Sequence, residues 1–314
     1  MWGPGKVWFD DLKISFVDEV AGDPEPEAAA PLENQVDVEI GDHVGQYLNL
    51  PALGDVPESG AGLLIVLPGG GGGADFHGFV KNIQAHGLED DFAVAQPIAK
   101  EWKPGQMNRI VWPTEGSKVD GMGYSTEELV EAVIADVSSK SKIDPKRVFV
   151  LAWSSGGPAE YAALLKKDSP LQGGLMAMSV FFDKQLPPLK NGKGKGVYIY
   201  HSPEDKICKY WIAKKAYDLL SDAGVKTKMV DYKGGHGWHG NTHGAINAGM
   251  RWLDTIRELS VEESEQLLEE AASDAAAKIA AAQESLDQAR ADAEAEVKAA
   301  QEKVTKAKNG SGKK

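Results

Sequence analysis

Three side chains that together can perform nucleophilic catalysis occur in the chain in the order serine, aspartate, histidine. They are Ser154 in "VFVLAWSSGGPAEYAALL", Asp205 in "VYIYHSPEDKI" and His236 in "VDYKGGHGWHG". A serine hydroxyl is a weak nucleophile until a histidine takes its proton, and the histidine needs a carboxylate that fixes its tautomer and stabilises the imidazolium. The pattern therefore predicts a catalytic triad if the fold brings the three residues together.

Two adjacent serines compete for the role of nucleophile. An apolar run that leads within a few residues into a helix predicts a sharp strand-to-helix corner, where the residues two positions before and after the nucleophile must be small. Around Ser154 these neighbours are Ala152 and Gly156, whereas around Ser155 one of them is Trp153. We therefore assign the nucleophile to Ser154, with alanine in place of the first glycine of a G-x-S-x-G turn.

Two alternatives remain open for the other members of the triad. Asp183, in "MSVFFDK", is a rival acid for Asp205 because it also follows an apolar run. His236, His239 and His243 are spaced by three and four residues, a spacing that also occurs in metal sites. We expect neither a metal nor another cofactor, and we expect His236 to be the base because glycines surround it.

The elements that must position these residues alternate between strand-like and helix-like patterns. Strands are predicted at 36–40, 46–50, 63–67, 92–97, 148–152, 174–180, 197–201 and 227–232. Helices are predicted near 76–86, 125–140, 156–167, 209–223 and 243–258. This order predicts an α/β fold with a mainly parallel central sheet and helices on both faces. Chemistry in such sheets gathers at the carboxyl ends of the strands, where the three triad candidates fall.

A run of five glycines in "LLIVLPGGGGGADF" follows one of the apolar strands. It lacks the Gly-Lys-Ser/Thr ending of a phosphate-binding loop. A loop without side chains instead lets backbone N–H groups approach a developing oxyanion.

Four tryptophans lie in or near the predicted strand-end loops, and they predict an aromatic-lined substrate pocket, although core packing explains buried tryptophans equally well. They are Trp102, Trp112, Trp153 and Trp238.

Composition divides the chain into four zones. Residues 1–17 read as an isolated strand, 18–35 as an acidic Pro/Ala-rich linker, 36–259 as the catalytic domain and 260–314 as an Ala/Glu/Lys-rich helical tail with a flexible end. Small and apolar residues recur along the tail in steps of four and three, which indicates either weak self-association through a coiled-coil seam or a single solvated helix.

Charge and hydropathy exclude several classes of partner. The net charge of −13 argues against a nucleic-acid ligand, and no apolar stretch reaches the length of a membrane span. Cys208 is the single cysteine, so an internal disulfide is excluded. The N-terminus lacks the pattern of a signal peptide, and we expect a soluble chain.

The chain resembles, over about residues 45–257, the α/β-hydrolase serine esterases of the polyhydroxybutyrate-depolymerase-like and feruloyl-esterase-like group. The resemblance is carried by the serine segment, by the Ile-Asp-x-x-Arg-Val pattern that begins at Ile143, and by "LPGGGGG", "HSPEDKI" and "GGHGWHG". One departure is Pro68, where many relatives have a histidine, and a second is Ala152.

The resemblance implies the α/β-hydrolase fold and hydrolysis of carboxylic esters through an acyl-enzyme. It implies Ser154 as nucleophile, Asp205 as acid and His236 as base, with an oxyanion hole made by the backbone N–H groups of Gly70 and Ser155. The expected ligand is a small-molecule ester or an ester linked to a polysaccharide. A catalytically silent binding or scaffold module of the same fold, and a prolyl-oligopeptidase-like peptidase, remain as alternatives.

The N-terminal "GPGKVWFDDLKI" resembles the last strand of a jelly-roll carbohydrate-binding module. It implies that the chain is the end of a longer parent protein, secreted or periplasmic. It also favours acyl groups on plant polysaccharide, such as feruloyl or acetyl esters, as the substrate.

Overall fold

The computed structural model describes residues 32–256 and 261–310 of the chain. The chain divides into two compact units, residues 1–251 and 252–314. The predicted N-terminal strand at 1–17 and most of the predicted linker at 18–35 lie outside the described residues. Within them, no helix has the length and apolar character that a membrane crossing requires.

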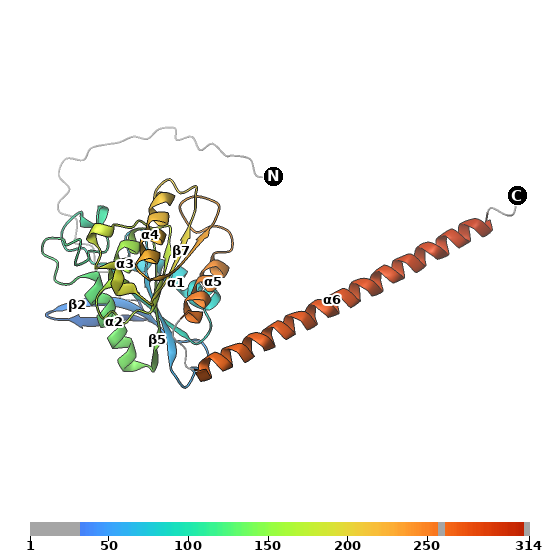
Figure 1. The fold of residues 1–314 in the computed structure, drawn as a ribbon, viewed down its shortest axis with the longest axis horizontal. Helices are drawn as coiled ribbons and strands as arrows, with labels where there is room; N and C mark the ends of the chain where they lie inside the picture. The colour runs from blue at the N-terminus through green and yellow to red at the C-terminus, as the bar shows by residue number, and fades with distance from the viewer. Residues whose placement is uncertain (1–31, 257–260, 311–314) are drawn as a thin grey trace, which may run out of the picture. The chain divides into compact units, whose positions relative to one another are not determined.

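The first unit is built on one eight-stranded sheet with the order β1-β2-β4-β3-β5-β6-β7-β8 (Figure 1). The strands are β1 (Gln35–Ile40), β2 (His43–Leu50), β3 (Ala61–Leu67), β4 (Phe92–Pro97), β5 (Ile143–Trp153), β6 (Gly173–Ala177), β7 (Gly196–His201) and β8 (Lys226–Asp231). β2 pairs antiparallel with β1 and β4, and the pairs from β4 through β3 to β8 are parallel. The predicted, mainly parallel sheet is therefore confirmed.

Helices cover both faces of this sheet. They are α1 (His77–Gly87), α2 (Thr126–Lys140), α3 (Gly157–Leu165), α4 (Tyr210–Asp222) and α5 (Thr242–Thr255). Figure 1 shows α2 and α3 on one side of the sheet and α1 with α5 on the other. Each helix connects or follows parallel strands, as a sheet buried on both faces requires.

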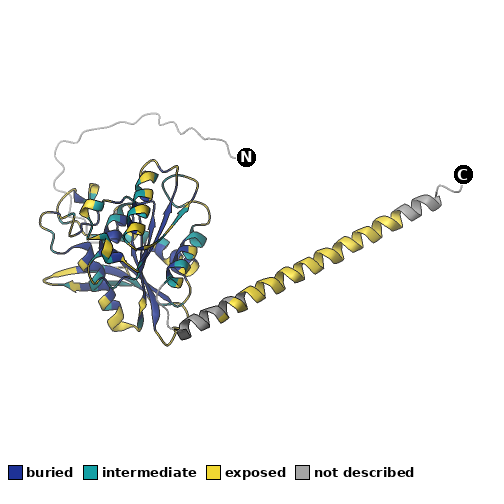
Figure 2. Ribbon diagram, in the orientation of Figure 1, coloured by how far each residue is buried: buried dark blue, intermediate teal, exposed yellow. Residues whose placement is uncertain are grey.

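The core lies along the middle strands, which Figure 2 shows as buried throughout. Every residue of β3, "AGLLIVL", is buried, and so is every residue of β4 and β7. Such continuous apolar runs are typical of parallel strands with helices on both faces. The rigid centre of the sheet holds the strand ends at which the candidate catalytic residues begin.

Several strand boundaries differ from the sequence prediction, and two of these differences have a clear local cause. β5 starts at Ile143 instead of residue 148, because Ile143 already pairs with Ala61 before a register shift in the β3–β5 ladder. β6 ends at Ala177 instead of residue 180, because Met178 has a φ of +41°, a left-handed conformation that ends an extended strand. The residue types around these positions indicate neither the register shift nor the left-handed conformation of Met178.

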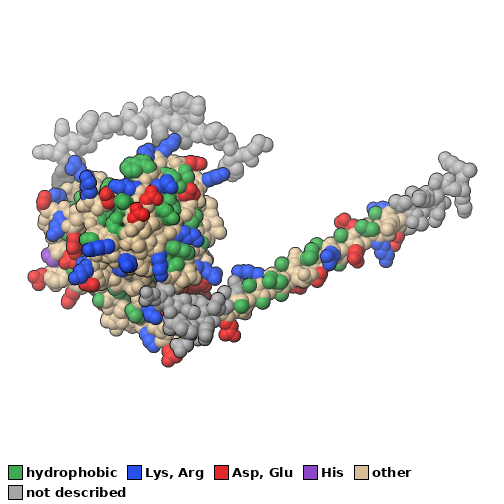
Figure 3. All heavy atoms as spheres, in the orientation of Figure 1, with side chains coloured by type: hydrophobic (Ala, Val, Ile, Leu, Met, Phe, Trp, Pro, Cys, Tyr) green, Lys and Arg blue, Asp and Glu red, His purple; other side chains and the backbone are tan. Residues whose placement is uncertain are grey.

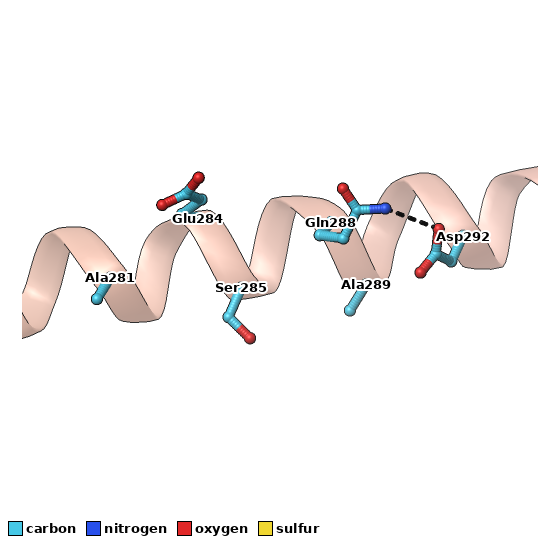
Figure 4. A pocket seen from close by; sticks show the side chains of 6 residues that line it. All are labelled: Ala281, Glu284, Ser285, Gln288, Ala289 and Asp292. Carbon is cyan, nitrogen blue, oxygen red and sulfur yellow. Dashed lines mark hydrogen bonds between the residues drawn. The ribbon is translucent and has the colours of Figure 1, made fainter.

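The second unit contains one long helix, α6 (Val261–Gly310). Figure 4 shows Ala281, Ser285 and Ala289 on one side of it, and the Gln288 amide donating to Asp292 one turn later, at 2.9 Å. Each side chain of α6 that the structure describes is exposed. The extended helical tail is therefore confirmed, whereas its self-association stays a prediction.

Candidate active site

Ser154 lies on a sharp corner between β5 and α3. Its φ is +53°, a left-handed conformation that costs a non-glycine residue energy and is found at strained functional turns. A short 3-10 turn, η3 (Ser154–Gly156), leads directly into α3, which has a proline in its first turn. A Cβ at Gly156 would collide with the Leu67 carbonyl oxygen, so glycine is required there. The corner presents Ser154 at the carboxyl edge of the sheet.

The structure brings Ser154, His236 and Asp205 into a continuous hydrogen-bonded relay. Ser154 Oγ lies 3.0 Å from His236 Nε2, and His236 Nδ1 lies 2.9 Å from Asp205 Oδ2. The three residues follow the ends of β5, β7 and β8. Ser154 and His236 are 82 positions apart in the chain. A histidine held between a hydroxyl and a buried carboxylate is arranged to accept the hydroxyl proton.

Asp205 is fixed on its other oxygen by the backbone. Its side chain is fully buried, and Oδ1 accepts the N–H groups of Ile207 and Cys208, each at 2.8 Å. Two backbone donors hold Oδ1 and leave Oδ2 oriented toward His236. The 202–208 loop therefore holds the carboxylate in one orientation.

The rival acid lies elsewhere. Asp183 forms an ion pair with Lys215 of α4 at 2.7 Å, and this pairing lowers the pKa of the Asp183 carboxyl. The carboxylate that reaches His236 is that of Asp205.

The three histidines do not form a metal cluster among the described residues. The one group there with suitably spaced ligand atoms is Asp205, Cys208 and His236. Burial raises the pKa of the Cys208 thiol to about 12, so the thiol of this group is protonated in the structure as described. This group is better described as two members of the relay beside a buried thiol.

The glycine loop after β3 is tied to the serine corner. Gly70 has a φ of +58°, and its carbonyl accepts a 2.9 Å hydrogen bond from the Ser155 hydroxyl. The two residues whose N–H groups are candidates for the oxyanion hole are thus linked to each other. The neighbouring Pro68 carbonyl accepts the indole N–H of Trp112 at 2.9 Å. The Trp112 side chain thereby holds the start of this loop at Pro68, the position at which many esterases of the resembled group have a histidine.

The four tryptophans have different surroundings. Trp112 is buried and packs beneath the glycine loop, where a Cβ at Gly72 would meet its ring at 2.8 Å. Trp102 stands edge-on to Tyr124, with ring centroids 4.7 Å apart, and lies under the Lys100 ammonium. Among the described residues, no ring contact or hydrogen bond joins Trp102 or Trp112 to Ser154, Asp205 or His236.

Trp153 and Trp238 belong to one aromatic cluster beside the serine corner. Their ring centroids are 6.0 Å apart, and Phe79 contacts both, at 5.6 Å from Trp153 and 6.1 Å from Trp238. Trp238 is half-buried, and its indole N–H has no hydrogen-bond partner among the described residues. Trp153 itself is buried, so Phe79 and Trp238 are the members of this cluster that are partly exposed.

His201 is a residue that the sequence analysis missed. It is fully buried at the end of β7, and its Nε2–H donates to the Cys208 carbonyl at 2.7 Å. The same nitrogen lies 3.5 Å from Asp205 Oδ2. Burial lowers the pKa of His201, so the ring stays neutral and braces the acid's loop as a donor. The available signal was a histidine ending an apolar strand four residues before the acid.

No family model and no curated protein matches the sequence. Among solved structures, the chain is similar to the carboxylesterase of Bacillus cereus, with a TM-score of 0.51, 18% identity, and 68% of this chain and 94% of that chain covered. A fungal esterase of Rhizomucor miehei gives a TM-score of 0.52 at 14% identity, with 70% of this chain and 84% of that one covered.

An acylaminoacyl peptidase of Pyrococcus horikoshii gives a TM-score of 0.53 at 13% identity, with 73% of this chain and 43% of that longer chain covered. At such identities the likeness concerns the arrangement of strands and helices. The sheet described above, with its serine corner after β5, agrees with that arrangement. The chain therefore has the α/β-hydrolase fold.

Proposed function

We propose that this protein is a serine hydrolase that cleaves carboxylic esters through an acyl-enzyme. The observation that carries the proposal is the relay from Ser154 Oγ through His236 to Asp205 Oδ2, with contacts of 3.0 Å and 2.9 Å. The relay stands on a strained corner, and evolution retains such strain where it serves function. The relay offers a nucleophile, a base and a carboxylate, the three side-chain groups that acyl transfer by a serine uses.

The reaction follows from the positions of these groups. Ser154 Oγ attacks the acyl carbon while its proton passes to His236 Nε2, and the negative Asp205 stabilises the imidazolium through Nδ1–H. The carbonyl oxygen becomes an oxyanion that the N–H groups of Gly70 and Ser155 stabilise. The bond to the alcohol then breaks, and His236 returns the proton to the leaving oxygen. Water repeats the sequence on the acyl-serine and releases the acid.

The substrate class is a narrower part of the proposal. The resemblance to feruloyl-esterase-like and polyhydroxybutyrate-depolymerase-like enzymes supports feruloyl or acetyl esters carried on plant polysaccharide. Within the aromatic cluster beside the serine corner Trp153 is buried, whereas the half-buried Phe79 and Trp238 offer apolar ring surface that suits an aromatic acyl group.

A fluorophosphonate probe tests the nucleophile directly, because it phosphonylates activated serines in proportion to their reactivity. We expect labelling of the wild-type protein at Ser154, located by peptide mass spectrometry, and none in Ser154→Ala. An unlabelled wild-type protein would favour the silent scaffold module. In a panel of aryl and feruloyl esters set against N-acyl-peptide anilides, faster cleavage of the anilides would favour the peptidase.

His201→Leu should lower kcat on phenyl acetate by about tenfold to a hundredfold, because the Cys208 carbonyl loses a buried donor. KM should change little, since the residue acts through Asp205 and touches no substrate. His201→Gln, whose amide nitrogen can replace Nε2–H, should recover part of the rate. Circular dichroism and thermal unfolding would show whether both variants fold. A folded leucine variant with wild-type kcat would remove the bracing role.

A further inference from the structure

A groove of about 330 Å³ lies between the segment that follows β6 and the start of α4. Its walls are residues 181–185 on one side, and Trp211, Ile212 and Lys215 on the other. The Asp183–Lys215 ion pair, at 2.7 Å, joins the two walls. Phe181 is buried and packs edge-on against Tyr161 of α3, with ring centroids 5.0 Å apart. Phe181 thus packs the groove against α3, and the Asp183–Lys215 ion pair links its two walls.

Two large aromatic side chains of this groove are exposed. Trp211 is 64% exposed and Phe182 is 47% exposed. Large apolar groups left in water beside a concave surface are typical of binding sites. Figure 3 shows hydrophobic side chains next to basic and acidic ones where α4 lies.

The chemistry of the groove matches a sugar ring. A pyranose presents a flat face of C–H groups that packs on an indole or phenyl ring, and a rim of hydroxyls that both donate and accept hydrogen bonds. The groove offers two aromatic faces with Lys184, Gln185 and the Asp183–Lys215 pair at its edge. A simple alkyl chain would leave these polar side chains unused.

Both walls of the groove belong to chain segments that also contact the candidate active site. The Ser179 hydroxyl donates to the Ser154 carbonyl at 3.2 Å, and Phe182 follows three residues later, so its Cα is at most about 11 Å from that of Ser179. On the other wall, α4 begins two residues after Cys208, whose N–H binds Asp205. Each wall of the groove therefore lies within a few residues of a segment that contacts the triad residues.

We propose that the groove binds a sugar ring in the alcohol part of the substrate. This inference rests on the proposed ester hydrolysis and adds a site for the part of the substrate that is not transferred to Ser154. Trp211 supplies the main stacking surface, and Phe182 supplies the second.

The test compares two substrates in Trp211→Ala, namely an acetylated xylo-oligosaccharide and phenyl acetate. We expect the KM for the oligosaccharide to rise about tenfold, because one aromatic stacking contact is lost, while kcat/KM for phenyl acetate stays at the wild-type value. Leu53→Ala is the matched control, because Leu53 is also a large exposed apolar residue, at 58%, and lies outside the groove. It should change neither substrate.

Equal losses on both substrates would mean that Trp211 supports the active site structurally, and this would overturn the sugar site. Wild-type values on both would overturn it as well. Calorimetric titration with the unacylated xylo-oligosaccharide separates this inference from the proposed function. Binding that disappears in Trp211→Ala supports the groove even if no ester is cleaved, and a wild-type protein that does not bind the oligosaccharide refutes it.

Discussion

Ser154→Ala lowers kcat/KM on phenyl acetate by about four to six orders of magnitude, the loss expected when a triad nucleophile is removed. The variant keeps the fold, because the serine is half-buried at a corner and its hydroxyl contributes chemistry, with little packing. Steady-state kinetics at high enzyme concentration measure the residual rate. Thermal unfolding checks that the melting temperature stays close to that of the wild type.

Ser155→Ala is the matched control for this prediction. The substitution removes the 2.9 Å hydrogen bond from the Ser155 hydroxyl to Gly70, and it keeps the backbone N–H that is proposed to bind the oxyanion. A single neutral hydrogen bond of this kind changes the rate by at most about tenfold. A dead Ser155→Ala beside an active Ser154→Ala would reverse the assignment of the nucleophile.

His236→Ala should cost several orders of magnitude in kcat, because no other described side chain bridges Ser154 Oγ and Asp205 Oδ2. The affinity for a small ester should change little, since the imidazole acts on the proton and not on the bound acyl group. Burst kinetics with an activated aryl ester separate acylation from deacylation. Both steps should slow, because the same nitrogen serves each of them.

His239→Ala is the control for the histidine assignment. His239 is exposed and packs near Gly234, and its ring centroid lies 6.1 Å from that of Tyr232. We expect at most a few-fold change in kcat/KM on the same ester. If His236→Ala retained wild-type turnover while His239→Ala lost it, the relay seen in the structure would not be the catalytic one.

The sequence by itself determined the architecture of the first unit. Continuous apolar runs such as "LLIVL" predict strands buried on both faces, and the intervening helical patterns require parallel connections. It also selected Ser154 over Ser155, because a strand-to-helix corner admits only small residues two positions away. These are local constraints of sterics and periodicity, and one stretch of chain is enough to express them.

The tertiary structure decided which acid and which histidine meet the serine. Asp183 and Asp205 both follow buried strands, but the 202–208 loop turns the Asp205 carboxylate toward His236, while Asp183 pairs with Lys215. The left-handed glycines Gly235 and Gly237 flank His236 and shape the turn that carries its ring to Ser154.

Supporting roles were also beyond the sequence. The sequence around Trp112 does not distinguish a tryptophan that donates to the Pro68 carbonyl from one that lines a pocket. It also does not show that His201 donates to the Cys208 carbonyl in the loop of Asp205. The early start of β5 likewise depends on its pairing with Ala61. The Trp112–Pro68 and Ile143–Ala61 contacts join segments that only the folded sheet brings together, and the His201–Cys208 contact depends on the path of the loop between the two residues. Hydrogen bonds and packing act over a few ångströms in space, whatever the separation along the chain.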